Sequence, residues 1–105
     1  ILGRKEITIA PIPDQFLLYQ NYPNPFNPTT TIKYALPKES YVDISVYDIL
    51  GHKIKSLVKE QQTPGIKNVE WDTSNELGRK VSSGVYFYII NADDFRDIKK
   101  MLIVK

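Results

Sequence analysis

The side chains that could take part in catalysis are few, and their spacing forms no catalytic motif. His52 is the only histidine, so any serine nucleophile would have a single imidazole as its base. None of the serines lies in a Gly-x-Ser-x-Gly turn, which presents the nucleophile in many hydrolases. Ser82 and Ser83 precede Gly84 and a run of β-forming residues, a pattern typical of a turn that opens a strand. The sequence therefore predicts no catalytic residue, and we expect that the protein is not an enzyme.

Carboxylates cluster in two places, and oxygen ligands of this kind suit calcium. One cluster lies within residues 72–76, and the other comprises Asp93, Asp94 and Asp97. Their spacing matches no complete EF-hand loop, and Asp, Asn and Ser in turns commonly bond to nearby backbone groups. No two acids are marked as the carboxylate pair of a glycoside hydrolase. We therefore expect turns at both clusters and no metal site.

Composition argues against several other classes of function. Cysteine is absent, which excludes a disulfide framework, a thiolate zinc site and a cysteine nucleophile. The 14 basic and 12 acidic residues leave a net charge of +2, and the basic residues are scattered, so no nucleic-acid partner is indicated. The longest apolar runs, such as residues 85–90, are far shorter than the roughly 20 residues that span a bilayer. We expect no membrane span and no cofactor.

Tyrosines are numerous, with seven in 105 residues, and they suggest a second class of function. Tyr86 and Tyr88 share one face of a predicted strand, and Tyr41 and Tyr47 lie on the predicted outer face of another. Stacked aromatic faces bind sugars, so a polysaccharide-binding module is one interpretation. Tyrosine is also a good strand former, and a structural role is the simpler interpretation.

The length corresponds to a single domain, preceded by a segment of different composition. All but one of the seven prolines lie between Pro11 and Pro37. Residues 1–15 are predicted to be a linker or the tail of a preceding domain, and residues 16–105 to form the domain itself. The chain opens at Ile1 without methionine or an apolar leader, so we expect it to be a piece of a longer protein.

The most unusual segment is proline-rich and is predicted to be extended and stiff. It reads Asn21, Tyr22, Pro23, Asn24, Pro25, Phe26, Asn27, Pro28. Each proline fixes its own φ angle and keeps the preceding residue out of the α region. We expect the asparagine amides to bond to local main-chain groups, and Tyr22 and Phe26 to cover one end of the core. The alternative is a proline-rich ligand for a partner domain.

Most of the remaining chain has the alternating pattern of β-strands. The expected strands are 30–36, 41–47, 54–58, 67–71, 85–90 and 97–104, with a short extended piece around Val81. Gly51 supplies a positive φ angle to the turn that begins near Asp48. Residues 85–90 are apolar at every position, which predicts a central strand covered on both faces. The expected fold is all-β, an antiparallel immunoglobulin-like β-sandwich of about seven strands, with a small barrel as the alternative.

Several stretches together resemble one family. They are Tyr22-Pro23-Asn24-Pro25-Phe26-Asn27-Pro28-Thr29-Thr30, Val46-Tyr47-Asp48-Ile49-Leu50-Gly51, Trp71-Asp72, Ser83-Gly84-Val85-Tyr86 and Lys99-Lys100-Met101-Leu102-Ile103-Val104-Lys105. In this order they look like the C-terminal sorting domain of the type IX (Por) secretion system, which is related to the immunoglobulin-like domain of the flagellar hook-capping protein. The resemblance covers about residues 16–105.

The resemblance implies a non-catalytic address label at the end of a larger secreted or cell-surface protein. Its expected partners are a protein of the outer-membrane secretion machinery and the upstream cargo domain of the same polypeptide. In this family the domain is read after folding in the periplasm and is often removed at the upstream linker. The alternative function is a carbohydrate-binding or passive accessory module attached to a secreted hydrolase.

The part of the family pattern tied most closely to export supplies the candidate recognition residues. They are Gly84, Val85, Tyr86, Lys99, Lys100, Met101, Leu102, Ile103, Val104 and Lys105. If the last strand borders its sheet, unpaired amides and carbonyls over residues 101–104 could extend into a receptor sheet, with the lysines giving orientation. Exposed sheet margins would also permit a weak homodimer.

Overall fold

The structure is a computed structural model, and it describes residues 11–105. Seven strands make up the ordered framework: β1 (Leu17–Leu18), β2 (Thr30–Leu36), β3 (Ser40–Asp48), β4 (Lys53–Gln62), β5 (Gly65–Trp71), β6 (Gly84–Ala92) and β7 (Phe95–Ile103). Residues 1–10, on which most of the linker prediction falls, lie outside the described part of the chain.

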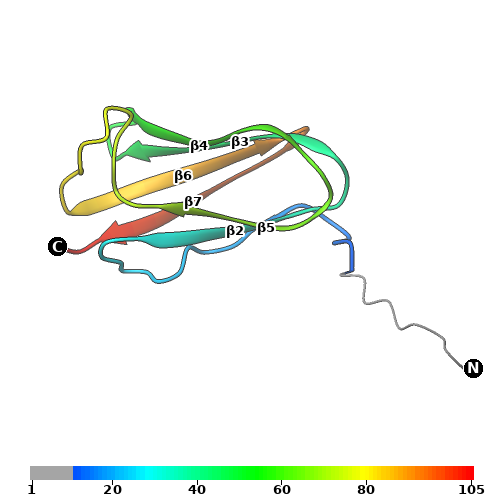
Figure 1. Cartoon of the computed structure of the whole chain (residues 1–105), viewed down its shortest axis with the longest axis horizontal. Helices are drawn as coiled ribbons and strands as arrows, with labels where there is room; N and C mark the ends of the chain where they lie inside the picture. Colours follow the sequence, from blue (N-terminus) through cyan, green and yellow to red (C-terminus); the bar gives the residue numbers. More distant parts are fainter. Residues whose placement is uncertain (1–10) are drawn as a thin grey trace, which may run out of the picture.

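The strands form two antiparallel sheets that face each other (Figure 1). One sheet has the order β1-β2-β5 and the other the order β4-β3-β6-β7. The all-β antiparallel sandwich of seven strands predicted from the sequence is confirmed. None of the described residues forms a helix long and apolar enough to cross a membrane.

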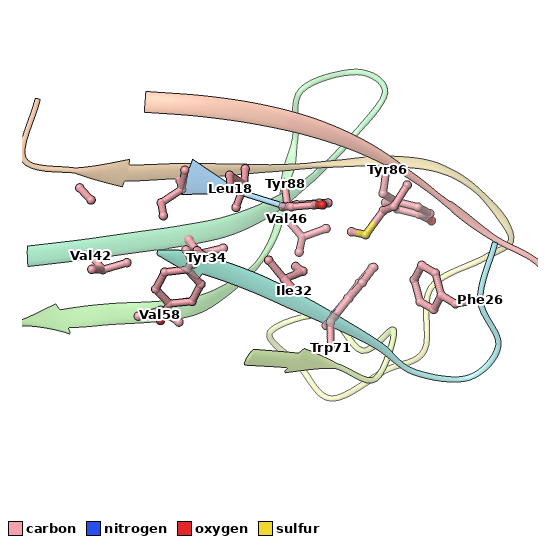
Figure 2. Close-up of a cluster of buried hydrophobic side chains, with 14 of the residues drawn as sticks. Leu18, Phe26, Ile32, Tyr34, Val42, Val46, Val58, Trp71, Tyr86 and Tyr88 are labelled. Carbon is pink, nitrogen blue, oxygen red and sulfur yellow. The ribbon is translucent and has the colours of Figure 1, made fainter. Parts of the chain in front are cut away.

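Side-chain alternation explains why these segments become strands of a sandwich. Val42, Ile44 and Val46 on β3 are fully buried, and Tyr41, Asp43 and Tyr47, which alternate with them, are exposed or half-buried on the outer face. Together with residues of the other strands they form one continuous core between the sheets (Figure 2). The short β1 was not predicted, because a strand of two residues carries no periodicity. Around Val81 the structure has only an isolated bridge, between Ser74 and Lys80.

β6 occupies the central position expected of its apolar sequence, but only one of its faces is deeply buried. It pairs with β3 on one side and β7 on the other. Tyr88 and Ile90 point into the core and are fully buried, whereas Phe87 and Ile89 on the opposite face are only half-buried. The prediction that this strand is covered on both faces is wrong, because no other described layer packs on the outer face of the four-stranded sheet.

The last strand, β7, lies at the margin of the four-stranded sheet, which meets the condition set for strand addition. It pairs with β6 from Ala92↔Phe95 to Gly84↔Ile103. This arrangement places the C-terminal end of β7 beside the beginning of β6 and leaves the other edge of β7 facing away from the sheet.

A buried hydroxyl ties the four-stranded sheet to the segment after β1, and it provides a test of the fold. Tyr88 is fully buried and donates a hydrogen bond to the carbonyl oxygen of Tyr19 at 2.7 Å. Tyr88→Phe removes this donor and leaves the carbonyl without it, so we expect a loss of about 1–2 kcal/mol in the free energy of unfolding. Urea unfolding followed by tryptophan fluorescence measures it. Tyr41→Phe, at a residue that is 48% exposed, should leave the value unchanged; an equal loss in both variants would contradict the assignment.

Candidate functional site

The proline-rich segment Pro23–Pro28, called the strap below, lies along the outer edge of the C-terminal part of β7. Phe26 and Ile103 form a parallel bridge. The Phe26 N–H donates to the carbonyl oxygen of Leu102 at 3.1 Å, and the Val104 N–H donates to the carbonyl oxygen of Phe26 at 3.0 Å. Phe26 is not a proline and keeps its N–H, so it can make the backbone pairing that its proline neighbours cannot.

Two side chains extend this cover along the same edge. The Oδ1 atom of Asn24 accepts a hydrogen bond from the Leu102 N–H at 2.9 Å. The Nε2 atom of Gln20 donates to the carbonyl oxygen of Lys100 at 2.7 Å. The prediction of unpaired amides and carbonyls over residues 101–104 is therefore wrong, because the strap and Gln20 already bond the groups that this part of β7 directs away from its sheet.

The strap is fixed at its base by a small hydrogen-bonded cluster. The Nδ2 atom of Asn21 donates to the carbonyl oxygen of Pro23 at 3.2 Å and to Oγ1 of Thr30 at 2.9 Å. The Thr30 hydroxyl in turn donates to the same Pro23 carbonyl at 2.9 Å. Both Asn21 and Thr30 are buried. The expected bonding of an asparagine amide to the local main chain is thus found at Asn21, while Asn24 instead reaches β7.

Aromatic packing joins the strap to the core (Figure 2). Phe26 is 3% exposed, and its ring lies 6.0 Å from that of Trp71, which in turn lies 5.7 Å from that of Tyr86. The indole N–H of Trp71 donates to the carbonyl oxygen of Ser74 at 2.8 Å. Phe26 covers the end of the core as expected, but the same prediction for Tyr22 is wrong, because Tyr22 is 80% exposed.

Burial also makes two of the four tyrosines of the sugar-binding interpretation, Tyr86 and Tyr88, inaccessible to a sugar. Tyr86, Tyr88 and Trp71 all point into the core. The tyrosine hydroxyls bond to main-chain carbonyls, that of Tyr86 to Ser82 and that of Tyr88 to Tyr19. Burial raises the pKa of the Tyr88 hydroxyl far above its ordinary value. Tyr41 and Tyr47 do lie on the outer face of β3, as expected.

The turn that carries Asp48 and Gly51 lies at the same end of the sandwich, since Asp48 pairs with Tyr86 in the sheet. The Oδ1 atom of Asp48 accepts hydrogen bonds from the N–H groups of Leu50 and His52, each at 2.9 Å. The φ angle of Gly51 is +85°, as expected for this turn. The backbone bond from His52 is the main reason that the pKa of Asp48 is lowered. Asp48 is therefore a turn-stabilising residue.

The acidic segment after β5 also follows turn chemistry. Asp72 Oδ1 accepts from the hydroxyl of Ser74 at 2.5 Å and from its N–H at 3.0 Å, and these bonds lower the pKa of Asp72. Asn75 Oδ1 accepts from the N–H groups of Leu77 and Arg79. Within residues 11–105, no group of three or more His, Cys, Asp or Glu side chains is placed to hold a metal ion.

The candidate recognition residues divide into buried and accessible ones. Met101 and Ile103 are buried, Tyr86 is buried, and Gly84, Val85 and Lys99 are half-buried. Lys100, Leu102, Val104 and Lys105 are exposed, and the ammonium group of Lys105 donates to the carbonyl oxygen of Val81. Sequence reasoning missed Gln20 and Thr30, because their contacts are specific to the folded end of the sandwich. The accessible part of the site is thus a small surface of side chains around the strap and the last residues of the chain.

Phe26 is the residue that holds the strap to the core, so its removal should release the strap. Phe26→Ala leaves a cavity beside Trp71, and we expect the free energy of unfolding to fall by about 3–5 kcal/mol. Tyr22→Ala, in the same segment but exposed, should change it by less than about 0.5 kcal/mol. Equilibrium urea unfolding of both variants makes the comparison. A small effect of Phe26→Ala would mean that the strap does not contribute to the core.

The lowered pKa of Asp72 makes part of the stability depend on pH. Its carboxylate is stabilised in the folded state, so the contribution is complete above the ordinary Asp pKa and is lost as the pH falls through the lowered folded value. Asp72→Ala should therefore melt at a lower temperature than the unmodified protein at pH 7, with the difference shrinking below about pH 4. The main cause of the lowered pKa is a hydrogen bond from Ser74, which salt does not screen as it screens a pair of charges. High salt should therefore preserve most of the difference in melting temperature. A difference that is constant with pH would rule out this role.

The described fold is similar to domains of two proteins of Porphyromonas gingivalis. Against dimeric latent PorU the sequence identity is 22% and the TM-score 0.66, over 91% of this chain and 10% of that one. The second protein is PorZ, described as an essential bacterial surface component of the type IX secretion system. Here the sequence identity is 18% and the TM-score 0.57, over 88% of this chain and 12% of that one. The chain thus spans about a tenth of the length of either protein. At these identities the likeness concerns the fold alone.

A family model supplies the sequence-level relationship. The model of the secretion system C-terminal sorting domain matches residues 20–105, which include the strap, the Asp48 turn, Trp71, the beginning of β6 and all of β7. No curated protein matches the chain. Because the match extends over most of the chain and through its last residue, this protein belongs to the family of C-terminal sorting domains of the type IX secretion system.

Proposed function

We propose that the export machinery recognises the accessible side chains around the strap and the end of β7, chiefly Lys100, Leu102, Val104 and Lys105. The observation that carries this proposal is the pairing of Phe26 with the edge of β7. An edge whose backbone groups are already bonded offers a receptor little opportunity to add a strand there. It does offer a fixed arrangement of two apolar and two cationic side chains.

This site would exist only after the domain has folded. The hydrogen bond between Asn24 and Leu102 joins residues 78 positions apart. A receptor that reads the strap and the last strand together would therefore reject an unfinished or unfolded chain. We infer that the domain folds in the periplasm before it directs export to the cell surface or the medium.

We further infer that the domain is a non-catalytic label for an upstream cargo domain, joined through residues 1–15. The single imidazole supports this inference: the side chain of His52 is 72% exposed and lies 3.3 Å from Asp48, on a turn rather than in a cavity. Two of the four tyrosines proposed for sugar binding, Tyr86 and Tyr88, are buried, which favours sorting over the carbohydrate-binding alternative.

A single exposed position tests recognition without disturbing the core. In a cargo fusion expressed in a bacterium with a type IX system, Val104→Asp should reduce the amount of exported cargo by about tenfold or more, because a charge would be buried at the contact. Val104 is 47% exposed, and Ile66, on the other sheet, is 48% exposed. Ile66→Asp is therefore a matched control and should export normally. Immunoblots of medium and cell fractions give the yields.

Deletion of residues 101–105 should also stop export, but it removes the buried Met101 and Ile103 and so tests folding as well as recognition. Melting curves of the isolated domain separate these effects, and Val104→Asp should melt like the unmodified protein. Normal export of Val104→Asp, or of cargo whose domain lacks residues 101–105, would refute the proposed role.

A further inference from the structure

The outer face of the four-stranded sheet has an apolar centre that nothing in the described chain covers. The half-buried Val85, Phe87 and Ile89 of β6 form its middle. Their partners in the sheet continue the apolar surface, Tyr47 on β3 opposite Phe87, and Ile98 and Leu102 on β7 opposite Ile89 and Val85. Ile98 is 52% exposed and Leu102 39%. The outer faces of antiparallel sandwiches are ordinarily polar, so an apolar face suggests a surface that is covered in use.

The face is also hollowed at its centre. A depression of ≈ 380 Å³ is lined by Tyr47, Phe87, Ile89 and Ile98 together with Arg96 and the Asp48 turn. Its walls are thus mostly aromatic and aliphatic, with a guanidinium group at the side. A depression of this kind receives a protruding apolar side chain of a partner.

Basic residues border this apolar centre on both sides. Lys53 and Lys59 lie on β4, opposite the outward Tyr47 and Asp43, and Arg96 and Lys100 lie on β7. All four are exposed. The acids on or beside this face are already engaged. Asp43 contacts Lys59 at 3.9 Å and accepts from Ser45, and Asp48 binds the backbone of its own turn. Asp93, which lines a depression with Tyr41 and Asp43, contacts Lys38 at 3.7 Å. The surface is therefore apolar at its centre and cationic at both margins.

This charge pattern argues against a second copy as the occupant. Both margins are basic, so any face-to-face pairing of two copies brings basic side chains against basic side chains, which is unfavourable. The described part of the linker lies on the other side of the sandwich, which does not favour the upstream cargo as the occupant. Residues 11–15 lie beside Leu17 and Tyr19 and beside Ile66 of β5, on the side of the three-stranded sheet (Figure 1).

We propose that this outer face docks a protein of the export machinery whose contact surface has apolar side chains bordered by aspartate and glutamate. The proposal rests on the sorting function above, and it extends the contact from the end of β7, with which it shares Lys100 and Leu102, across the outer face of the sheet. Charged margins of this kind chiefly increase the rate of encounter and fix orientation, while the apolar centre supplies the affinity.

Cross-linking in living cells tests the contact at its centre. A benzophenone amino acid replaces Ile98 in the full cargo protein, and Ile66 in a control of similar exposure. Irradiation should give one heavier adduct from position 98 and none from position 66. Mass spectrometry of that adduct should identify a partner peptide with apolar residues next to aspartate or glutamate. No adduct at position 98, an adduct of twice the cargo mass, or a basic partner peptide would overturn the proposal.

Charge reversal tests the basic margins of the outer face. It changes none of the residues of the first proposed site, which are Lys100, Leu102, Val104 and Lys105. Arg96→Glu combined with Lys53→Glu should reduce both the adduct and the export yield by about tenfold, with an unchanged melting temperature. Lys33→Glu combined with Lys67→Glu makes the same change in charge on the three-stranded sheet and should alter neither. If Val104→Asp blocks export while the Arg96 and Lys53 double variant exports normally, docking on the outer face is refuted and recognition at the strap and the end of β7 stands. If the double variant blocks export while Val104→Asp exports normally, recognition at the end of β7 is refuted and docking on the outer face stands.

A cationic apolar face could instead bind an anionic lipid surface, and a separate measurement decides this. Phe87 and Ile89 are half-buried between their neighbours rather than protruding, which is unfavourable for insertion into lipid. Sedimentation of the purified domain with phosphatidylglycerol vesicles should show no binding at physiological salt. Binding that the Arg96 and Lys53 double variant abolishes would overturn the protein-docking proposal in favour of a lipid surface.

Discussion

The pairing of Phe26 with the edge of β7 is the interaction on which the rest of this domain depends. It gives the terminal strand a backbone partner on the side away from its sheet. It also places an aromatic ring against Trp71 and so closes the end of the core. A proline-rich segment can do this because it is stiff before folding and because one non-proline residue in it retains its N–H. Without that residue, the last strand would have an exposed edge, and the core an open end.

Covering this edge has a consequence for the proposed export of a folded domain. Exposed edges of sheets pair readily with other chains, which leads to aggregation. Here the strap and Gln20 bond the outward groups between Lys100 and Val104, so this part of the domain presents side chains instead of backbone. Recognition through side chains is more selective than strand addition, which accepts many sequences. Among the described residues, no buried side-chain nitrogen or oxygen lacks a hydrogen-bond partner, in agreement with a fully closed end.

The sequence predicted a strand well where the residues on its two faces differ in polarity. Ile32, Tyr34 and Leu36 alternate with smaller or polar residues, and all three are buried as that pattern requires. It could not predict which face of β6 is buried, because a run that is apolar at every position has no period. It could not distinguish Phe26 from Tyr22 either, since the prolines between them remove any regular alternation. The contacts between the strap and β7 were beyond reach for a different reason, which is that they join residues 78 positions apart.

The uncovered face of β6 and the covered edge of β7 are better understood together. Both lie on the same sheet, but they differ in what is exposed. Backbone groups at the edge are bonded within the domain, whereas apolar side chains on the face are partly exposed. An exposed apolar face carries a risk of nonspecific association, which basic side chains at both margins reduce by repelling other copies of the domain. The same margins attract an acidic surface. The residues that limit self-association would then also select the partner, so solubility before export and docking during export would depend on one arrangement of charge.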